Sequence, residues 1–313
     1  MTLNLFSRFT SNPQSLVNML NQPGTFLNDV YVNQITFGDA ILTIRPNDAA
    51  TAYYKGRQLF TVENMITRSE PKIYSRYLPI VRSDVLLKIK NTQRILNKQP
   101  LGEPTMTEIQ WQSRVQTQLG FSHVRPEILD NIKKDSWPEG TQVSYLYHFS
   151  PLTVNNVSEI ILLDVEAAFS HDGTRLSERI DVVLFNTVKR QLLFLEVKRL
   201  SDQRLESKGG NDPVIVSQLK QYQSVINSQN SNIIAQYNHV IETYNILSGK
   251  QYPYINNEME IKLGLLVVDY NRGNLNKLKT LKKDLAQTNI KVLSIGHLKH
   301  VTAGTLADWY RKL

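Results

Sequence analysis

The chain has 313 residues, 41% of them hydrophobic, so it is long enough for one large domain or two small ones with a substantial core. The absence of cysteine excludes disulfides, thiolate zinc sites and thiol nucleophiles, while a net charge of +8 favours a polyanionic partner. No apolar run approaches the roughly 18–20 residues that span a bilayer, and the N-terminus lacks the apolar segment of a signal peptide, so we expect a cytoplasmic protein without a membrane partner.

Residues 1–100 are predicted to form a β-rich accessory region. Apolar and polar side chains alternate over 27–62, which is typical of half-buried strands joined by turns. Residues 73–90 follow a similar pattern, although 83–98 also fit a helix. The segment 97–104 contains two prolines and a glycine, and it predicts a connector to a second domain over 105–313.

Two groups of cations in this region are interleaved with tyrosines. Lys55 and Arg57 follow Tyr53-Tyr54, while Lys72 and Arg76 flank Tyr74 and precede Tyr77. Cations beside amphipathic aromatic rings suit phosphate contact and base stacking, so these four basic residues are predicted to bind nucleic acid. The alternative is a half-buried strand whose polar face happens to be basic.

The second region is predicted to alternate helices and strands. Thr107 caps a helix that begins at Glu108, and the helical spacing continues through Trp111, Val115 and Leu119. We then expect strands at 142–149, 157–169, 179–186 and 191–198, a long helix at 213–247, a strand at 261–269, a helix at 274–287, a strand at 290–295 and a terminal helix at 303–312. The fold class is therefore α/β (α+β-like): a mixed central sheet flanked by helices, with the β-rich region before it.

Charged residues interrupt two of these apolar strands. Asp181 lies within 179–186, and Glu196 and Lys198 lie within 191–198. If the turn at 187–190 centres between Val188 and Lys189, Asp181 faces Glu196, and facing side chains share one side of a sheet. Lys198 is two residues from Glu196 and shares that side as well. Two carboxylates and one ammonium should therefore converge.

This constellation suits metal-assisted hydrolysis of a phosphodiester bond. Two carboxylates can hold Mg²⁺ or Mn²⁺, which makes bound water more acidic and polarises the phosphoryl oxygen. The lysine can orient the water or stabilise charge in the transition state. The alternative is an ordinary ion pair on a surface hairpin, but the apolar residues around all three charges indicate buried strands.

A helix after the second charged strand carries two further candidates. Asp212-Pro213 marks its start, and Gln218 and Tyr222 lie four residues apart on one helical face. The alternative is that Tyr222 simply packs and Gln218 faces water.

In order and in strand context, Asp181 and Glu196-Val197-Lys198 resemble the motif of the PD-(D/E)xK nuclease superfamily, with Ile180 in the place of the proline. Gln218-x-x-x-Tyr222 after that motif is similar to the RecB-like branch. The resemblance covers residues 105–295 in outline and implies a restriction-endonuclease-like core of helix, three strands, helix and strand.

The resemblance implies a metal-dependent deoxyribonuclease in restriction or phage defence, with Asp181 and Glu196 as metal ligands and Lys198, Gln218 and Tyr222 as further catalytic residues. In that family the helix before the sheet often supplies a glutamate, and Glu108 is the first candidate for this third ligand; the alternative is a solvated first-turn glutamate. DNA is the expected substrate, with RNA as an alternative. A nuclease-fold scaffold without activity stays open as a second interpretation, as does a homo-oligomer.

Overall fold

The computed structural model describes residues 6–8, 10–63, 70–79, 105–115, 118–171, 174–207, 212–286, 288 and 290–313. The helices in these ranges are α1 (Pro13–Leu20), α2 (Phe26–Val30), α4 (Glu108–Val115), α5 (Arg125–Asp135), α6 (Pro138–Ser144), α7 (Val214–Ser248), α8 (Leu275–Ala286) and α9 (Ala303–Lys312). The strands are β1 (Ala40–Arg45), β2 (Ala49–Tyr54), β3 (Arg57–Val62), β4 (Ile73–Tyr74), β5 (Thr105–Met106), β6 (Ile160–His171), β7 (Thr174–Asn186), β8 (Gln191–Arg199), β9 (Lys262–Val268) and β10 (Val292–Ser294). No helix of the described part is long and apolar enough to cross a membrane.

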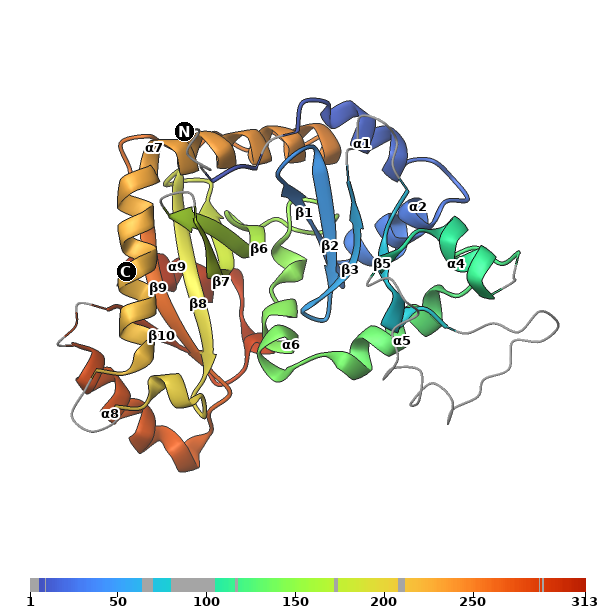
Figure 1. The fold of residues 1–313 in the computed structure, drawn as a ribbon. Helices are drawn as coiled ribbons and strands as arrows, with labels where there is room; N and C mark the ends of the chain where they lie inside the picture. The colour runs from blue at the N-terminus through green and yellow to red at the C-terminus, as the bar shows by residue number, and fades with distance from the viewer. Residues whose placement is uncertain are drawn as a thin grey trace.

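A five-stranded mixed sheet of order β10-β9-β8-β7-β6 forms the centre of the C-terminal part (Figure 1). Its strands β6, β7 and β8 are antiparallel neighbours, whereas β8, β9 and β10 run parallel. The predicted fold class is confirmed in outline: the molecule is mixed α/β, with a mixed sheet and helices beside it. Residues Asn186 and Gln191 pair across the turn, as the hairpin prediction requires.

Helices cover both faces of this sheet because its central strands are apolar on both sides. Val183 and Phe185 of β7 pack into the core that includes α7 and α8, while Val182 and Leu184 face the core that includes α6 and α9. Helix α7 is interrupted at Gln229, whose φ of −119° and ψ of 16° are not helical. Its first arm follows the sheet, and its second arm runs across the top of the molecule toward α1 (Figure 1).

The N-terminal lobe consists of the antiparallel sheet β1-β2-β3, the pair β4-β5 and helices α1, α2, α4 and α5. Strand β5 pairs with β4, and α5 contacts β2 and β3. Residues 105–115 and 118–135 thus pack with the N-terminal sheet, although the sequence analysis assigned them to the second domain. The predicted connector at 97–104 and the ambiguous segment 83–98 lie outside the described residues.

Two strand predictions are wrong. Residues 27–35, placed in alternating strand material, lie in α2 and a π-helical turn, and the Thr25 side chain caps α2 by accepting a hydrogen bond from the Asn28 N–H. The predicted strand 142–149 is largely α6 and a 3₁₀ turn at Tyr147–Phe149. In that segment Val143, Leu146 and Tyr147 are buried at helical spacing, which overrides the alternation in the sequence.

The turn between β2 and β3 presses against α6. An added Cβ on Gly56, which has φ of +76°, would lie 2.3 Å from backbone atoms of Gly140. Gly24 has a similar φ of +79° with no atom within 4 Å of its added Cβ. Gly56→Ala and Gly24→Ala should both be destabilised, because alanine is strained in a left-handed backbone conformation. We expect Gly56→Ala to lose about 1–3 kcal/mol more unfolding free energy than Gly24→Ala, because only at Gly56 does the added methyl group overlap neighbouring atoms. Urea denaturation measures the difference, and equal losses would contradict the close contact.

Candidate active site on strands β7 and β8

Asp181, Glu196 and Lys198 meet where β7 and β8 separate. The strands pair Val182 with Leu195, so Asp181 and Glu196 are the next opposing residues. The Lys198 ammonium contacts Glu196 Oε1, lies 3.0 Å from the Val197 carbonyl oxygen and lies 3.6 Å from Asp181 Oδ2. The Val197 N–H donates to Asp181 Oδ2 at 2.7 Å. Glu196 and Lys198 are buried, while the Asp181 side chain keeps 31% exposure and opens the cluster to solvent.

Helix α7 places Gln218 and Tyr222 over Glu196. Gln218 Nε2 donates to Glu196 Oε1 at 2.9 Å and lies 3.1 Å from the Tyr222 hydroxyl. All five predicted catalytic residues are therefore in one place, connected through Glu196. Two buried acceptors there have no hydrogen-bond partner among the described residues, namely Glu196 Oε2 and Gln218 Oε1. Such atoms are costly to bury, which marks the cluster as a place for a donor or a cation.

The charges of the cluster perturb one another. Burial, with a further contribution from the nearby Asp181 carboxylate, raises the pKa of Glu196 to about 8, against the opposing effects of Lys198 and Gln218. Burial also raises the pKa of Asp181, while Lys198 and the Val197 N–H oppose this shift. Burial disfavours the charged form of Lys198, but Asp181 and Glu196 outweigh it and raise the lysine pKa. Groups poised in this way are typical of catalytic sites.

The raised pKa of Glu196 makes stability depend on pH. Because the folded protein holds this proton up to about pH 8 and the unfolded chain releases it near its ordinary value of 4.5, the contribution is complete below 4.5 and is lost as pH rises to about 8. We expect Glu196→Gln, without added metal, to unfold at a higher temperature than the parent at pH 8, with a smaller difference at pH 5. Thermal unfolding of both proteins across this range measures it, and parallel curves would contradict the pKa shift.

Glu139, which was not among the candidates from the sequence, joins the site together with Glu166. Glu139 in the first turn of α6 accepts a hydrogen bond from the Arg199 N–H at 3.2 Å, and burial raises its pKa against the opposing charge of Lys198. Glu139, Glu166 and Asp181 line a cavity of about 20 Å³, room for one water molecule. Pro138, directly before Glu139, is typical of a helix start. The sequence predicted a strand at 142–149 instead, so a helix at this position was not considered.

The structure does not bring Glu108 to this cluster. Its carboxylate accepts a hydrogen bond from the Phe121 N–H at 3.0 Å and lines a separate cavity of about 820 Å³ in the N-terminal lobe. Glu139, rather than Glu108, is the helix glutamate beside Asp181, because α6, not α4, is the helix that packs against β8. Glu108 instead holds the loop after α4.

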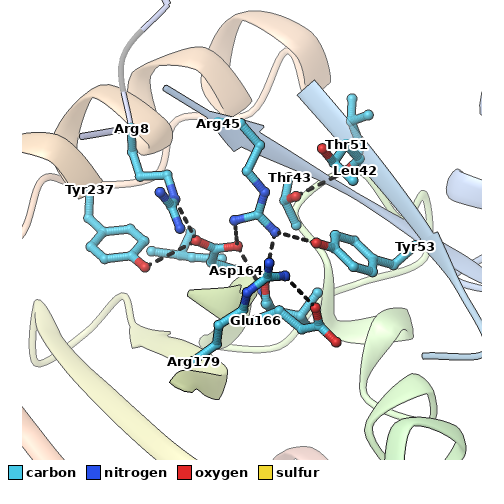
Figure 2. A network of polar contacts seen from close by, with 12 residues as sticks. Arg8, Leu42, Thr43, Arg45, Thr51, Tyr53, Asp164, Glu166, Arg179 and Tyr237 are labelled. Atoms are coloured by element: carbon cyan, nitrogen blue, oxygen red, sulfur yellow. Dashed lines mark hydrogen bonds and ion pairs between the residues drawn. The ribbon is translucent and has the colours of Figure 1, made fainter. Parts of the chain in front are cut away.

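A buried ion network lies beside the site on β6 (Figure 2). The Asp164 carboxylate accepts hydrogen bonds from Arg8 Nε and Arg45 Nη1, each at 2.8 Å, and from the Tyr237 hydroxyl at 3.2 Å. The β6–β7 register shifts between Leu162 and Asp164, and Glu166 adopts a left-handed φ of +52°. Asp164 and Glu166 share a strand face by spacing, but the left-handed backbone at Glu166 directs its side chain toward Arg179 and the Asp181 cavity instead.

Three of the four predicted nucleic-acid-binding residues form ion pairs with acidic side chains. Arg57 lies 3.4 Å and Arg76 lies 3.5 Å from Asp135 Oδ2, and Arg57 also covers the Trp137 ring at 3.9 Å. Lys72 lies 2.5 Å from Glu63 Oε2. Lys55 differs, since its ammonium lies over the rings of Tyr54 and Tyr145.

Within the described residues, no group of three or more histidine, aspartate or glutamate side chains is arranged to hold a metal ion. The donor set nevertheless fits a hard divalent cation, because Glu196 Oε2 is a buried carboxylate oxygen without a described partner and Asp181 is accessible beside it.

No protein-family model, no curated protein and no solved structure matches this chain.

Proposed function

We propose that this protein is a divalent-metal-dependent nuclease that hydrolyses phosphodiester bonds of DNA at the Asp181–Glu196–Lys198 cluster. The observation that carries the proposal is the convergence of two carboxylates and one ammonium at the point where two buried strands separate, beside an unsatisfied carboxylate oxygen. Burying such charges is costly and does not stabilise a fold by itself, which favours a catalytic purpose.

The arrangement of elements supports the same proposal. Helix α6, strands β6, β7 and β8, helix α7 and strand β9 follow one another in the order of a restriction-endonuclease-like core. The site lies on the second and third of these strands, and the helices before and after the three strands supply Glu139 and Gln218.

Each residue has a role that follows from its contacts. Asp181 and Glu196 would hold the cation, with Glu139 as a further carboxylate, and the bound cation would acidify water and polarise the phosphate. Gln218 orients Glu196 through the 2.9 Å hydrogen bond, and its partner Tyr222 limits how Gln218 turns. Lys198, released from the carboxylates that a cation neutralises, can donate to a phosphoryl oxygen or to the attacking water.

The proposal is tested with purified protein on supercoiled plasmid, linear single-stranded DNA and single-stranded RNA, each with Mg²⁺, Mn²⁺ or EDTA. We expect cleavage of DNA that EDTA abolishes and that Asp181→Asn removes with little change in melting temperature. Asp308→Asn is the matched control, because Asp308 is an exposed acid in surface ion pairs on α9. Cleavage by Asp181→Asn at the parent rate would refute the assignment, and cleavage of RNA alone would change the substrate.

A nuclease-fold scaffold without activity is the second candidate. The observation that favours it is the position of Lys198, whose ammonium already neutralises both carboxylates and contacts the Val197 carbonyl oxygen. The same assay separates the two: nucleic-acid binding without metal-dependent cleavage would support the scaffold.

A further inference from the structure

A strip of cationic and aromatic side chains from three distant parts of the sequence runs beside α6. Lys55 Nζ lies 5.6 Å from the ring centroid of Tyr54 and 5.9 Å from that of Tyr145, which follows α6. The Tyr145 ring lies 5.0 Å from His297, and His297 lies 6.1 Å from His300. Lys299 lies in the same 3₁₀ turn as His300 (Leu298–His300), and both are exposed.

The two lysines of this strip differ from Arg57, Lys72 and Arg76, the other predicted nucleic-acid-binding residues. Among the described residues, no carboxylate forms an ion pair with Lys55 or Lys299, whereas Arg57, Lys72 and Arg76 each have an acidic partner. The nearby carboxylate of Asp269 is itself paired with Arg199 at 2.5 Å. The strip therefore presents positive charge that the fold leaves available.

The backbone at Lys55 also points to a purpose other than folding. Lys55 has φ of +49° and Gly56 has φ of +76°, as in a hairpin turn with two left-handed residues. Asparagine, aspartate or glycine is preferred at the first of these positions, and lysine is strained there. Such strain is commonly retained at functional sites.

Two contacts fix the strip relative to the active site. The Leu298 N–H donates to Gln142 Oε1 at 2.9 Å, and Gly56 packs on Gly140, so the turns that carry Lys299 and Lys55 are both attached to α6. Glu139 stands at the start of the same helix and Tyr145 follows its end. At about 1.5 Å per residue, the strip and the active site are about 10 Å apart along this helix, a distance of a few nucleotides.

We propose that this strip, centred on Lys55, Tyr145, His297 and Lys299, binds the phosphate backbone of the nucleic acid that is cleaved at Asp181. This inference rests on the proposed nuclease function and adds where the substrate strand leaves the active site. The two ammonium groups contact phosphates, and the Tyr145 and His297 rings between them contact the sugars and bases. The strand thus passes along α6, between the N-terminal lobe and the C-terminal turn.

The experiment measures binding of the full chain in EDTA to fluorescent single- and double-stranded DNA between about 50 and 200 mM salt. The double variant Lys55→Ala/Lys299→Ala is compared with Lys72→Ala/Arg76→Ala, which removes the same number of charges from side chains that already have acidic partners. We expect the first variant to bind at least about tenfold more weakly at low salt and its log–log salt slope to flatten by about two, and the control to stay close to the parent. Melting temperatures of both variants check that they fold.

The outcomes separate this inference from the proposed function. If the parent cleaves DNA but Lys55→Ala/Lys299→Ala binds with unchanged affinity and slope, the strip is not the substrate path and the nuclease stands. If the control loses as much affinity as the double variant, binding depends on net charge alone and the strip is again refuted. If the parent neither cleaves nor binds nucleic acid, the nuclease proposal fails and the strip fails with it.

Discussion

Replacing Asp164 with alanine should lower the free energy of unfolding by about 3–5 kcal/mol, the range for removing one partner of a buried ion pair. Asp164 is 1% exposed and accepts hydrogen bonds from Arg8, Arg45 and Tyr237 (Figure 2). Its removal leaves two guanidinium groups in low-polarity surroundings without their counter-charge. The loss should be large because the network also joins the N-terminal lobe, through Arg45 of β1, to strand β6.

Urea denaturation measures this loss, and Asp308→Ala is the matched control. Asp308 also interacts with two cations, Arg311 and Lys312, but on the surface of α9, where such pairs contribute about 0–1 kcal/mol. An Asp164→Ala protein as stable as the control would show that Arg8 and Arg45 are satisfied without it. The Val165 carbonyl and the Tyr53 hydroxyl, both bonded to Arg45, would then account for the compensation.

Replacing Lys198 with methionine should slow metal-dependent cleavage by about 10²–10³-fold, the usual effect of losing one electrostatic donor in an active site. Methionine keeps the apolar stem of the buried side chain but removes the ammonium that lies between Asp181 and Glu196. Lys198→Arg should not restore the rate, because a planar guanidinium does not fit the buried space of a compact ammonium.

Single-turnover cleavage measures the rate, and calorimetric titration with Mn²⁺ shows whether the cation still binds. We expect Lys198→Met to bind Mn²⁺ at least as tightly as the parent, since the cation no longer competes with the ammonium for the two carboxylates. Cleavage by Lys198→Met at the parent rate would remove Lys198 from the mechanism. Loss of Mn²⁺ binding would instead show that the lysine maintains the site's structure.

The sequence was sufficient for the parts of the site that depend on local geometry. A short turn between two apolar strands sets their register, so Asp181 had to come opposite Glu196, and Lys198 had to share its face. Gln218 and Tyr222 lie on one side of α7 because they are four residues apart in a helix. The alternation of strands and helices in the second region follows from the same periodicities.

Contacts between residues far apart in the chain decided the rest. Glu139 rather than Glu108 stands beside Asp181, because α6 packs on β8 while α4 belongs to the N-terminal lobe. Asp135 forms ion pairs with Arg57 and Arg76, and Glu63 forms one with Lys72. Lys55, by contrast, reaches Tyr145 across the contact between Gly56 and Gly140.

The bulge in β6 shows the physical reason most directly. Spacing in the sequence places Asp164 and Glu166 on one face, because side chains alternate in a regular strand. Arg8 and Arg45 form ion pairs with Asp164, whereas the left-handed backbone at Glu166 directs that side chain to the cavity beside Asp181. Local periodicity determines which side chains a segment presents, but the irregular backbone and the long-range contacts of the fold determine which of them reach the candidate site.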